Sequence, residues 1–206
     1  MNDKAGAVVA LALYAIFGSV GFGWRSWLQW RNTGSTGFRG VSGRPGSAEW
    51  FGGVGLVIAV VVTVGAPVLQ LAGIVAPVGF LGAEWIQVAG IALALAGIGA
   101  TVYAQIDMGD SWRIGVDDSE TTTLVNSGVF AFVRNPIYLA MFVFWFGVVL
   151  VAPNIVAIVG YLLVLSSIEL QVRVVEEPYL LKTHGDTYRH YAGRVGRFLP
   201  GVGLIR

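Results

Sequence analysis

Two short segments in the second half of the sequence combine residue types that can bind a charged small molecule. The first is Arg134-Asn135-Pro136-Ile137-Tyr138, which leads directly into a long apolar run. Asparagine is a good N-cap, proline suits the first helical position, and the residue before a proline is held extended, so we predict a helix that begins at Pro136. The free N–H groups of a helix start attract a carboxylate or a phosphate. Asn-Pro alone indicates only a capped helix start, but Arg134 adds a fixed cation and favours an anion site.

The second segment carries four charged residues near the end of the same apolar region: Glu169, Arg173, Glu176 and Glu177. Residues four apart share a helix face, which places Arg173 beside both Glu169 and Glu177. Carboxylates at a helix C-terminus oppose the helix dipole, and two of them close to lipid are costly. A ligand with a cationic group and hydroxyl donors would compensate for them, and so would an ordinary salt bridge to Arg173. This segment alone leaves both interpretations open.

The composition predicts that these segments belong to an integral membrane protein. Hydrophobic residues make up 55% of the 206 residues, charged residues only 12%, and the mean hydropathy is +0.72. Soluble globular chains carry roughly 25% charged residues. The absence of cysteine excludes disulfides, thiolate metal sites and cysteine nucleophiles. The two histidines, His184 and His190, lie too far from other ligand types to indicate a metal site, and a net charge of +1 gives no attraction to nucleic acid.

Long apolar runs give the number of membrane helices, because a span needs about 20 apolar residues to cross ~30 Å of hydrocarbon. The runs cover residues 6–24, 52–76, 85–106 and 137–165. The last run is too long for one span, and Ala152-Pro153-Asn154 in its middle favours a turn. We therefore predict a helical hairpin over residues 136–151 and 155–177, which gives an all-α integral membrane protein with five transmembrane helices.

The basic residues predict how these helices are oriented. With five spans, the first long loop, the loop of Arg113 and Arg134, and the segment after the core of the last span lie on one side of the membrane. Together they hold all of the 13 lysines and arginines except Lys4. The positive-inside rule then places the N-terminus outside and the C-terminus in the cytoplasm. Residues 1–108 would form three transmembrane helices with a basic cytoplasmic loop, and residues 109–206 a cofactor-binding region with the hairpin and a C-terminal tail.

The predicted hairpin brings the two charged segments together. If its helices are adjacent and antiparallel, the start of the first, at Arg134, and the end of the second, at Glu177, meet at one cytoplasmic mouth. That mouth offers an anion site, two carboxylates and the aromatic rings of Phe130, Phe132, Tyr138 and Tyr179. A cofactor that is zwitterionic and aromatic and carries a cationic sulfur would suit it.

Six elements follow one another through this region. They are Leu124-Val125-x-Ser127-Gly128, Arg134-Asn135-Pro136-x-Tyr138, a hydrophobic hairpin, Glu176-Glu177, Gly185-x-x-Tyr188-x-x-Tyr191 and Arg197-x-x-Pro200. In this order they resemble the isoprenylcysteine carboxyl methyltransferase family. The related phospholipid N-methyltransferases share the arginine-x-proline and Glu-Glu elements. The resemblance covers about residues 109–200, and Asp110-Ser111-Trp112-Arg113 also looks like the segment that precedes the motif in bacterial members.

The resemblance implies a membrane enzyme that binds S-adenosyl-L-methionine at its cytoplasmic face. The residues it assigns to the cofactor are Leu124, Val125, Gly128, Arg134, Asn135, Pro136, Tyr138, Glu176 and Glu177. It associates Arg173 with the substrate and makes Arg173, Glu176 and Glu177 the candidate catalytic residues. Two positions depart from the family pattern. Asn135 stands where histidine is frequent, which removes an acid–base group, and Phe130 stands where tyrosine is common, which removes a hydroxyl.

The cofactor chemistry implies what the protein has to do. A sulfonium methyl is already activated, so the protein aligns the reactants and excludes water. A carboxylate acceptor needs no base, whereas an amine would have to lose a proton, for which Glu176 and Glu177 are the candidates. The resemblance favours carboxyl O-methylation and leaves N-methylation open. The expected acceptor is lipid-like or prenylated and enters sideways from the bilayer, among membrane lipids. The identity of that acceptor and the oligomeric state stay open.

Two alternatives compete with this prediction. An NADPH-dependent membrane reductase of the steroid 5α-reductase type has a similar C-terminal architecture, but its phosphate-rich cofactor would need more arginine and fewer carboxylates at the mouth. Glu176-Glu177 therefore counts against it. A non-enzymatic small membrane protein, such as a transporter or an assembly factor, is the other alternative. A transporter would place ionisable residues near the midplane and show internal repeats, and this sequence does neither.

Overall fold

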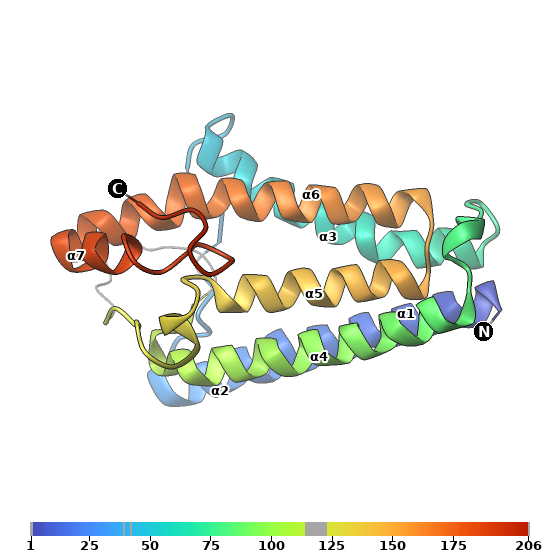
Figure 1. Ribbon diagram of the computed structural model, residues 1–206, viewed down its shortest axis with the longest axis horizontal. Helices are drawn as coiled ribbons and strands as arrows, with labels where there is room; N and C mark the ends of the chain where they lie inside the picture. The colour runs from blue at the N-terminus through green and yellow to red at the C-terminus, as the bar shows by residue number, and fades with distance from the viewer. Residues whose placement is uncertain (1, 39, 42, 114–122, 206) are drawn as a thin grey trace.

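The computed structural model describes residues 2–38, 40–41, 43–113 and 123–205, and over these ranges the regular secondary structure is helical, with isolated β-bridges but no strands. Long helices lie side by side along the molecule (Figure 1). In chain order the elements are α1 (Asp3–Phe17), the π-helix η1 (Gly18–Trp24), α2 (Arg25–Thr33), α3 (Ala48–Leu71), the 3-10 helix η2 (Gly79–Leu81), α4 (Glu84–Met108), the 3-10 helices η3 (Gly109–Ser111) and η4 (Gly128–Ala131), α5 (Pro136–Val151), α6 (Ile155–Gln171), the π-helix η5 (Val172–Glu176) and α7 (Glu177–Ala192). The predicted all-α class is confirmed.

The helices match the predicted spans closely. Within the described ranges, the stretches that are long and apolar enough to cross a membrane are Asp3–Thr33, Ala48–Leu71, Glu84–Met108 and Ile155–Ala192. α5 is apolar too but has only 16 residues. The second span, predicted over 52–76, begins earlier and ends earlier, at Leu71. It begins earlier because Ser47 caps α3, its hydroxyl accepting a hydrogen bond from the N–H of Trp50 at 3.2 Å. The count of five membrane spans stays a prediction, since α5 is shorter than the usual length of about 20 residues.

The predicted turn at Ala152-Pro153-Asn154 is confirmed. α5 ends at Val151 and α6 begins at Ile155. Asn154 caps α6, because its side-chain oxygen accepts a hydrogen bond from the backbone N–H of Ala157 at 2.9 Å. The two helices run antiparallel (Figure 1), yet α5 packs chiefly against α4, and α6 against α3. The arms of the hairpin therefore belong to two different helix pairs.

Glycines let α4 and α5 approach to backbone contact. A Cβ atom at Gly97 of α4 would lie only 2.5 Å from the backbone nitrogen of Phe144, and one at Gly90 only 2.7 Å from the carbonyl oxygen of Gly147. Small residues of this kind are typical of helix interfaces in lipid, where close packing replaces the hydrophobic effect. The tight pair fixes the start of α5, at Pro136, against the end of α4.

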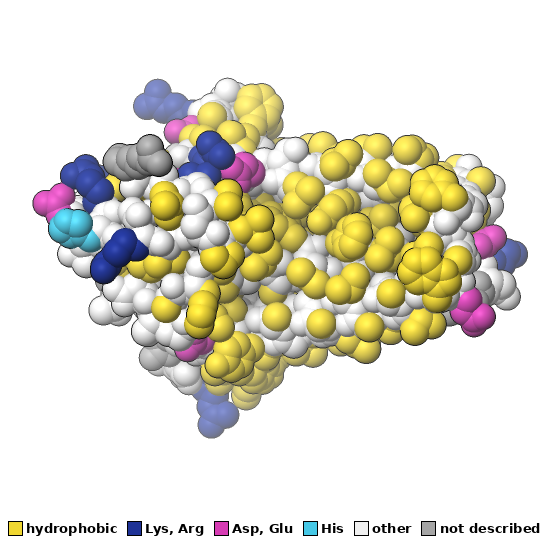
Figure 2. Space-filling view, in the orientation of Figure 1, with side chains coloured by type: hydrophobic (Ala, Val, Ile, Leu, Met, Phe, Trp, Pro, Cys, Tyr) yellow, Lys and Arg dark blue, Asp and Glu magenta, His cyan; other side chains and the backbone are white. Residues whose placement is uncertain are grey.

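The surface divides into an apolar flank and charged ends. Hydrophobic side chains cover the middle of the helices, and the charged side chains gather toward the two ends of the molecule (Figure 2). The apolar flank includes Val61 of α3 and Leu162 of α6, which are 66% and 55% exposed. Such a belt is the surface that a bilayer covers, so the chain has the form of a multi-pass membrane protein.

Candidate functional site

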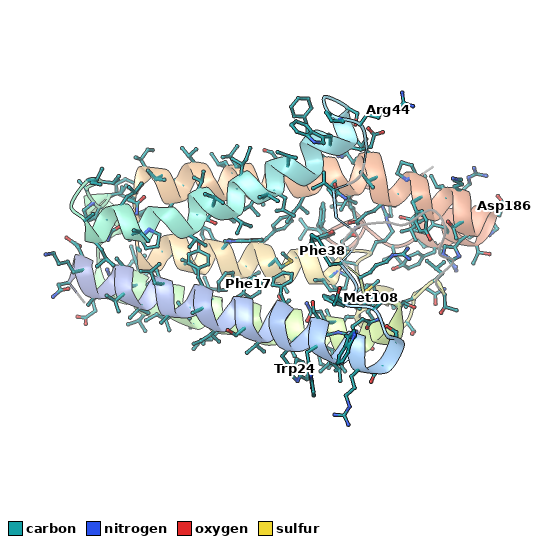
Figure 3. The ribbon with its side chains drawn as sticks, turned by 180° about the vertical axis from the view of Figure 1, so that it is seen from behind. Phe17, Trp24, Phe38, Arg44, Met108 and Asp186 are labelled. Carbon is teal, nitrogen blue, oxygen red and sulfur yellow. The ribbon has the colours of Figure 1, made fainter. Side chains whose placement is uncertain are left out.

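A cavity of about 610 Å³ opens where the end of α4, the start of α5 and the segment from η5 to α7 meet. Its polar part includes Arg113, Arg134, Asn135, Tyr138, Glu176, Glu177 and Tyr179. Its apolar part extends between the helices and includes Tyr14, Phe17, Leu56, Val57, Val60, Val61, Met141 and Trp145. Phe17, Phe38 and Met108, which line its wall, are labelled in Figure 3. The cavity thus joins a charged end to an apolar interior.

The cavity brings the predicted cofactor residues together. All of them line it except Gly128. Two of the predicted mouth aromatics, Phe130 and Tyr179, line it as well, whereas Phe132 does not and is 70% exposed. The structure therefore places the residues in one space; that they bind a cofactor stays a prediction.

Gly128 serves the backbone next to the cavity. Its φ is +56°, and a Cβ atom there would lie 2.1 Å from a carboxylate oxygen of Asp107. The same carboxylate accepts a hydrogen bond from the N–H of Val129 at 2.8 Å. Only glycine combines this left-handed conformation with so close an approach. Gly128 thereby ties η4 to the end of α4.

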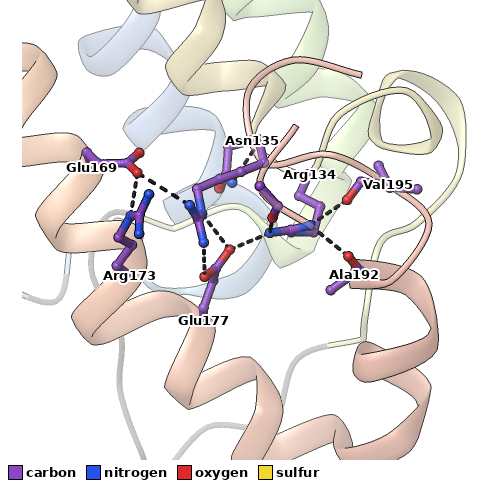
Figure 4. Close-up of polar contacts among 9 residues, drawn as sticks. Arg134, Asn135, Glu169, Arg173, Glu177, Ala192 and Val195 are labelled. Carbon is purple, nitrogen blue, oxygen red and sulfur yellow. Dashed lines mark hydrogen bonds and ion pairs between the residues drawn. The ribbon is translucent and has the colours of Figure 1, made fainter. Parts of the chain in front are cut away.

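Arg134 is buried, and its guanidinium is surrounded by acceptors of the protein (Figure 4). One terminal nitrogen, Nη1, donates to the carbonyl oxygens of Ala192, at 3.0 Å, and Val195. The other, Nη2, donates to the carboxylate of Glu177 at 2.6 Å and to the carbonyl oxygen of Gly203 at 2.8 Å. Both terminal nitrogens are therefore already occupied. The predicted role of Arg134 in cofactor binding stays a prediction.

Glu177 holds a second arginine that the sequence did not single out as a site residue. Arg197 donates from Nε and Nη2 to the two oxygens of the Glu177 carboxylate, each at 2.8 Å. These bonds raise the pKa of the Arg197 guanidinium above its ordinary value, so it stays charged at physiological pH. The only signal in the sequence was the terminal Arg197-x-x-Pro200 motif. The two arginines, rather than Arg173, compensate the buried charge of Glu177.

The C-terminal strap, residues 193–205, folds back over the start of α5. The backbone N–H of Arg134 donates to the carbonyl oxygen of Gly196 at 2.8 Å, and that of Asn135 to the carbonyl oxygen of Arg197 at 3.1 Å. The side-chain nitrogen of Asn135 donates to the same Arg197 oxygen at 3.1 Å. The strap and the helix start therefore form one unit.

The helix start at Pro136 is confirmed, but the predicted capping by Asn135 is wrong. Asn135 occupies the N-cap position, yet its side chain makes no capping hydrogen bond because its amide reaches the strap instead. Its ψ angle is 60°, not the extended value expected before a proline. The strap thus replaces local capping as the restraint on this helix start.

Glu176 differs from Glu177 although the two are adjacent. It lines the cavity, and its carboxylate accepts a hydrogen bond from the hydroxyl of Tyr138. Within the part of the chain that the structure describes, no lysine or arginine forms an ion pair with it. Successive helical residues point in different directions, so one glutamate turns to the arginines and the other to the cavity. Glu176 is therefore the carboxylate available to a cationic ligand.

Arg173 lies outside the cavity lining. Its side chain is 59% exposed and forms an ion pair with Glu169, which also accepts a hydrogen bond from Arg197 at 3.3 Å (Figure 4). The salt bridge to Arg173, one of the two interpretations that the sequence left open, is therefore present for Glu169, whereas Glu177 pairs with other arginines. The predicted contact of Arg173 with substrate stays a prediction.

Known proteins resemble this chain in sequence and in fold. The model of the phospholipid methyltransferase family matches residues 85–187. The protein-S-isoprenylcysteine O-methyltransferase of Schizosaccharomyces pombe is 34% identical over 77 residues, which are 37% of this chain and 33% of that protein. The match thus spans only about a third of that relative's length.

A solved structure gives the likeness in fold. The eukaryotic intramembrane Ras methyltransferase ICMT (isoprenylcysteine carboxyl methyltransferase) aligns with a TM-score of 0.66 and 18% identity. The alignment covers 100% of this chain and 70% of that one. At this identity the comparison establishes a shared fold, and it extends to the first helices, which the family model does not reach.

Proposed function

Because the chain belongs to the phospholipid methyltransferase family, whose model matches half of it, we propose that it is a membrane methyltransferase dependent on S-adenosyl-L-methionine. The observation that carries this proposal is the continuous cavity, which joins a charged end to an apolar interior. A volume of about 610 Å³ is within the roughly 300–1,000 Å³ of small-molecule sites. When bound, the cofactor supplies a methyl group on a sulfonium, which is already activated for transfer.

The polar end of the cavity fits such a cofactor. Glu176 offers a carboxylate to an ammonium or sulfonium group, and the hydroxyl of Tyr138 fixes one of its oxygens. Phe130 and Tyr179 add aromatic faces against which an adenine can pack. Glu177 acts indirectly: it holds Arg134 and Arg197, and through them the strap that folds over the start of α5. Alignment and exclusion of water are then the work of these residues.

The apolar part of the cavity supports a lipid-like or prenylated acceptor. Val57 and Val61 of α3 line it and are also 58% and 66% exposed on the flank of the bundle. A wall shared by the cavity and the flank gives an apolar chain a sideways route from the bilayer. The S. pombe relative is named for methylation of an isoprenylcysteine, which favours a carboxylate as the acceptor. For an amine acceptor, Glu176 would take the proton.

The proposed topology puts the polar end in the cytoplasm. Five spans, with α5 and α6 as the last two, place the N-terminus outside and the C-terminus inside by the positive-inside rule. The strap and α7, which carry Lys182, Arg189, Arg194 and Arg197, then face the cytoplasm.

Transfer of a labelled methyl group tests the proposal. Purified protein in liposomes would be supplied with methyl-labelled cofactor and either N-acetyl-S-farnesylcysteine or phosphatidylethanolamine. We expect a base-labile methyl ester on the prenylated acid. If only the amine acquires label, and the label is stable to base, the reaction is N-methylation and not O-methylation. No transfer to either, with binding of NADPH instead, would favour the reductase.

A further inference from the structure

One arginine of the cavity has no carboxylate partner within the described ranges. Arg134 and Arg197 share Glu177, whereas Arg113 lines the cavity and forms no ion pair among those residues. Its terminal nitrogen Nη1 is buried without a hydrogen-bond partner. A buried, unsatisfied donor on a charged group is costly, so its presence indicates a ligand that completes it.

The guanidinium of Arg113 is held in a defined orientation. Its central carbon lies 4.9 Å from the centre of the Tyr179 ring. Stacking of this kind fixes the plane of the guanidinium without consuming its N–H groups. Tyr179 lies in the first turn of α7 and is buried, so the helix holds its ring in place.

The backbone before Arg113 is anchored as well. Trp112 is buried, and the guanidinium of Arg25 lies 4.6 Å from the centre of its ring. Arg25 also donates to the carbonyl oxygen of Gly109 at 2.6 Å, and Gly37 packs against the same indole. The backbone next to Arg113 is therefore held in place, and the Arg113 side chain reaches the cavity from just beyond the end of α4.

Carboxylate is the ligand chemistry that this arrangement fits. A planar guanidinium matches a carboxylate with two parallel hydrogen bonds. Glu176 attracts Arg113 electrostatically, but one oxygen of Glu176 is bonded to Tyr138, and within the described ranges Glu176 and Arg113 form no salt bridge. Arg113 and Glu176 thus both line the polar end without pairing with each other, which suits a ligand pair that carries a carboxylate beside positive groups.

Resting on the proposed function, we propose that Arg113 binds a carboxylate in the cavity, either that of the cofactor or that of the acceptor. The resemblance had associated Arg134 with the cofactor and Arg173 with the substrate. The former has both terminal nitrogens occupied, and the latter lies outside the cavity. Arg113 offers a terminal nitrogen, Nη1, that has no partner, whereas Arg134 has only its Nε without one.

Calorimetric titration in detergent tests this proposal without requiring turnover. The ligands are S-adenosylhomocysteine, its decarboxylated analogue, N-acetyl-S-farnesylcysteine and the carboxamide of that acid. The proteins are wild type, Arg113→Gln, Arg113→Lys and the control Arg31→Ala. Arg31 is an exposed arginine whose guanidinium also stacks on an aromatic ring, with its central carbon 5.6 Å from the centre of the Trp27 ring. It lies outside the cavity lining. Thermal unfolding verifies that each variant is folded.

Arg113→Gln should lower the affinity for one of the two carboxylate ligands by roughly 10- to 100-fold and leave the affinity for its carboxylate-free analogue unchanged. If the variant loses affinity for S-adenosylhomocysteine, Arg113 binds the carboxylate of the cofactor. If it loses affinity for N-acetyl-S-farnesylcysteine, Arg113 binds the carboxylate of the acceptor. Arg113→Lys should recover part of the loss, and Arg31→Ala should match wild type. Equal affinities in wild type and Arg113→Gln, or equal losses for the carboxylate-free analogues, would overturn the proposal. If wild type binds neither ligand, the proposed function fails and the role of Arg113 with it.

Discussion

Replacing Arg134 by alanine should destabilise the C-terminal region of the protein, whether or not a ligand is bound. The side chains of Arg134 and Glu177 are only 2% and 8% exposed, so the ion pair is buried. Removing one partner of a buried ion pair costs about 3–5 kcal/mol, because the other charge is left uncompensated. Arg197 still holds Glu177, which lowers the cost, but three carbonyl oxygens also lose their donor. We expect a loss of at least about 3 kcal/mol in the free energy of unfolding.

The assay is thermal unfolding in detergent, with limited proteolysis of the strap. For a chain of this size a loss of 1 kcal/mol lowers the Tm by about 2–4 °C, so Arg134→Ala should lower it by roughly 6–12 °C. The control is Arg189→Ala, since Arg189 and Asp186 form an ion pair with side chains 63% and 81% exposed. Such a pair contributes at most about 1 kcal/mol. An Arg134→Ala protein with the Tm of wild type and a protected strap would refute the structural role.

Three further outcomes follow from the same contacts. Glu176→Gln should weaken S-adenosylhomocysteine by roughly 10-fold or more with little change in Tm, whereas Glu177→Gln should lower the Tm, because two arginines lose their charged partner; equal effects of the two would contradict their separation. Gly128→Ala should cost at least about 1–2 kcal/mol for its left-handed φ, seen as a lower midpoint in thermal unfolding, and an unchanged midpoint would speak against the contact with Asp107. Reporter fusions after Gly203 should report a cytoplasmic C-terminus; an external signal would refute the five-span topology.

The helices and the hairpin could be predicted because their signals are local. Apolar runs give the spans, Pro136 gives the start of α5, and Pro153-Asn154 gives the turn before α6. The convergence of Arg134, Tyr138 and the two glutamates was predicted from an antiparallel hairpin, although its two helices pack mainly against α4 and α3. These are relations between neighbours in sequence or between the ends of one hairpin.

The partners of the charged groups could not be predicted in this way. Arg134 bonds to the strap some sixty residues later in the chain, and no local pattern pairs it with Ala192 or Gly203. The strap likewise draws the Asn135 side chain away from capping. Arg113 was noted only as part of a family-like segment, since its importance depends on the buried nitrogen and on the ring of Tyr179. Such facts arise from tertiary packing.

Binding of S-adenosylhomocysteine tests the central claim most directly. Calorimetry of the detergent-solubilised protein would compare this ligand with NADPH. We predict saturable binding of S-adenosylhomocysteine to one site per chain, weakened by Glu176→Gln, and no binding of NADPH. Saturable binding of NADPH, with none of S-adenosylhomocysteine, would contradict the account.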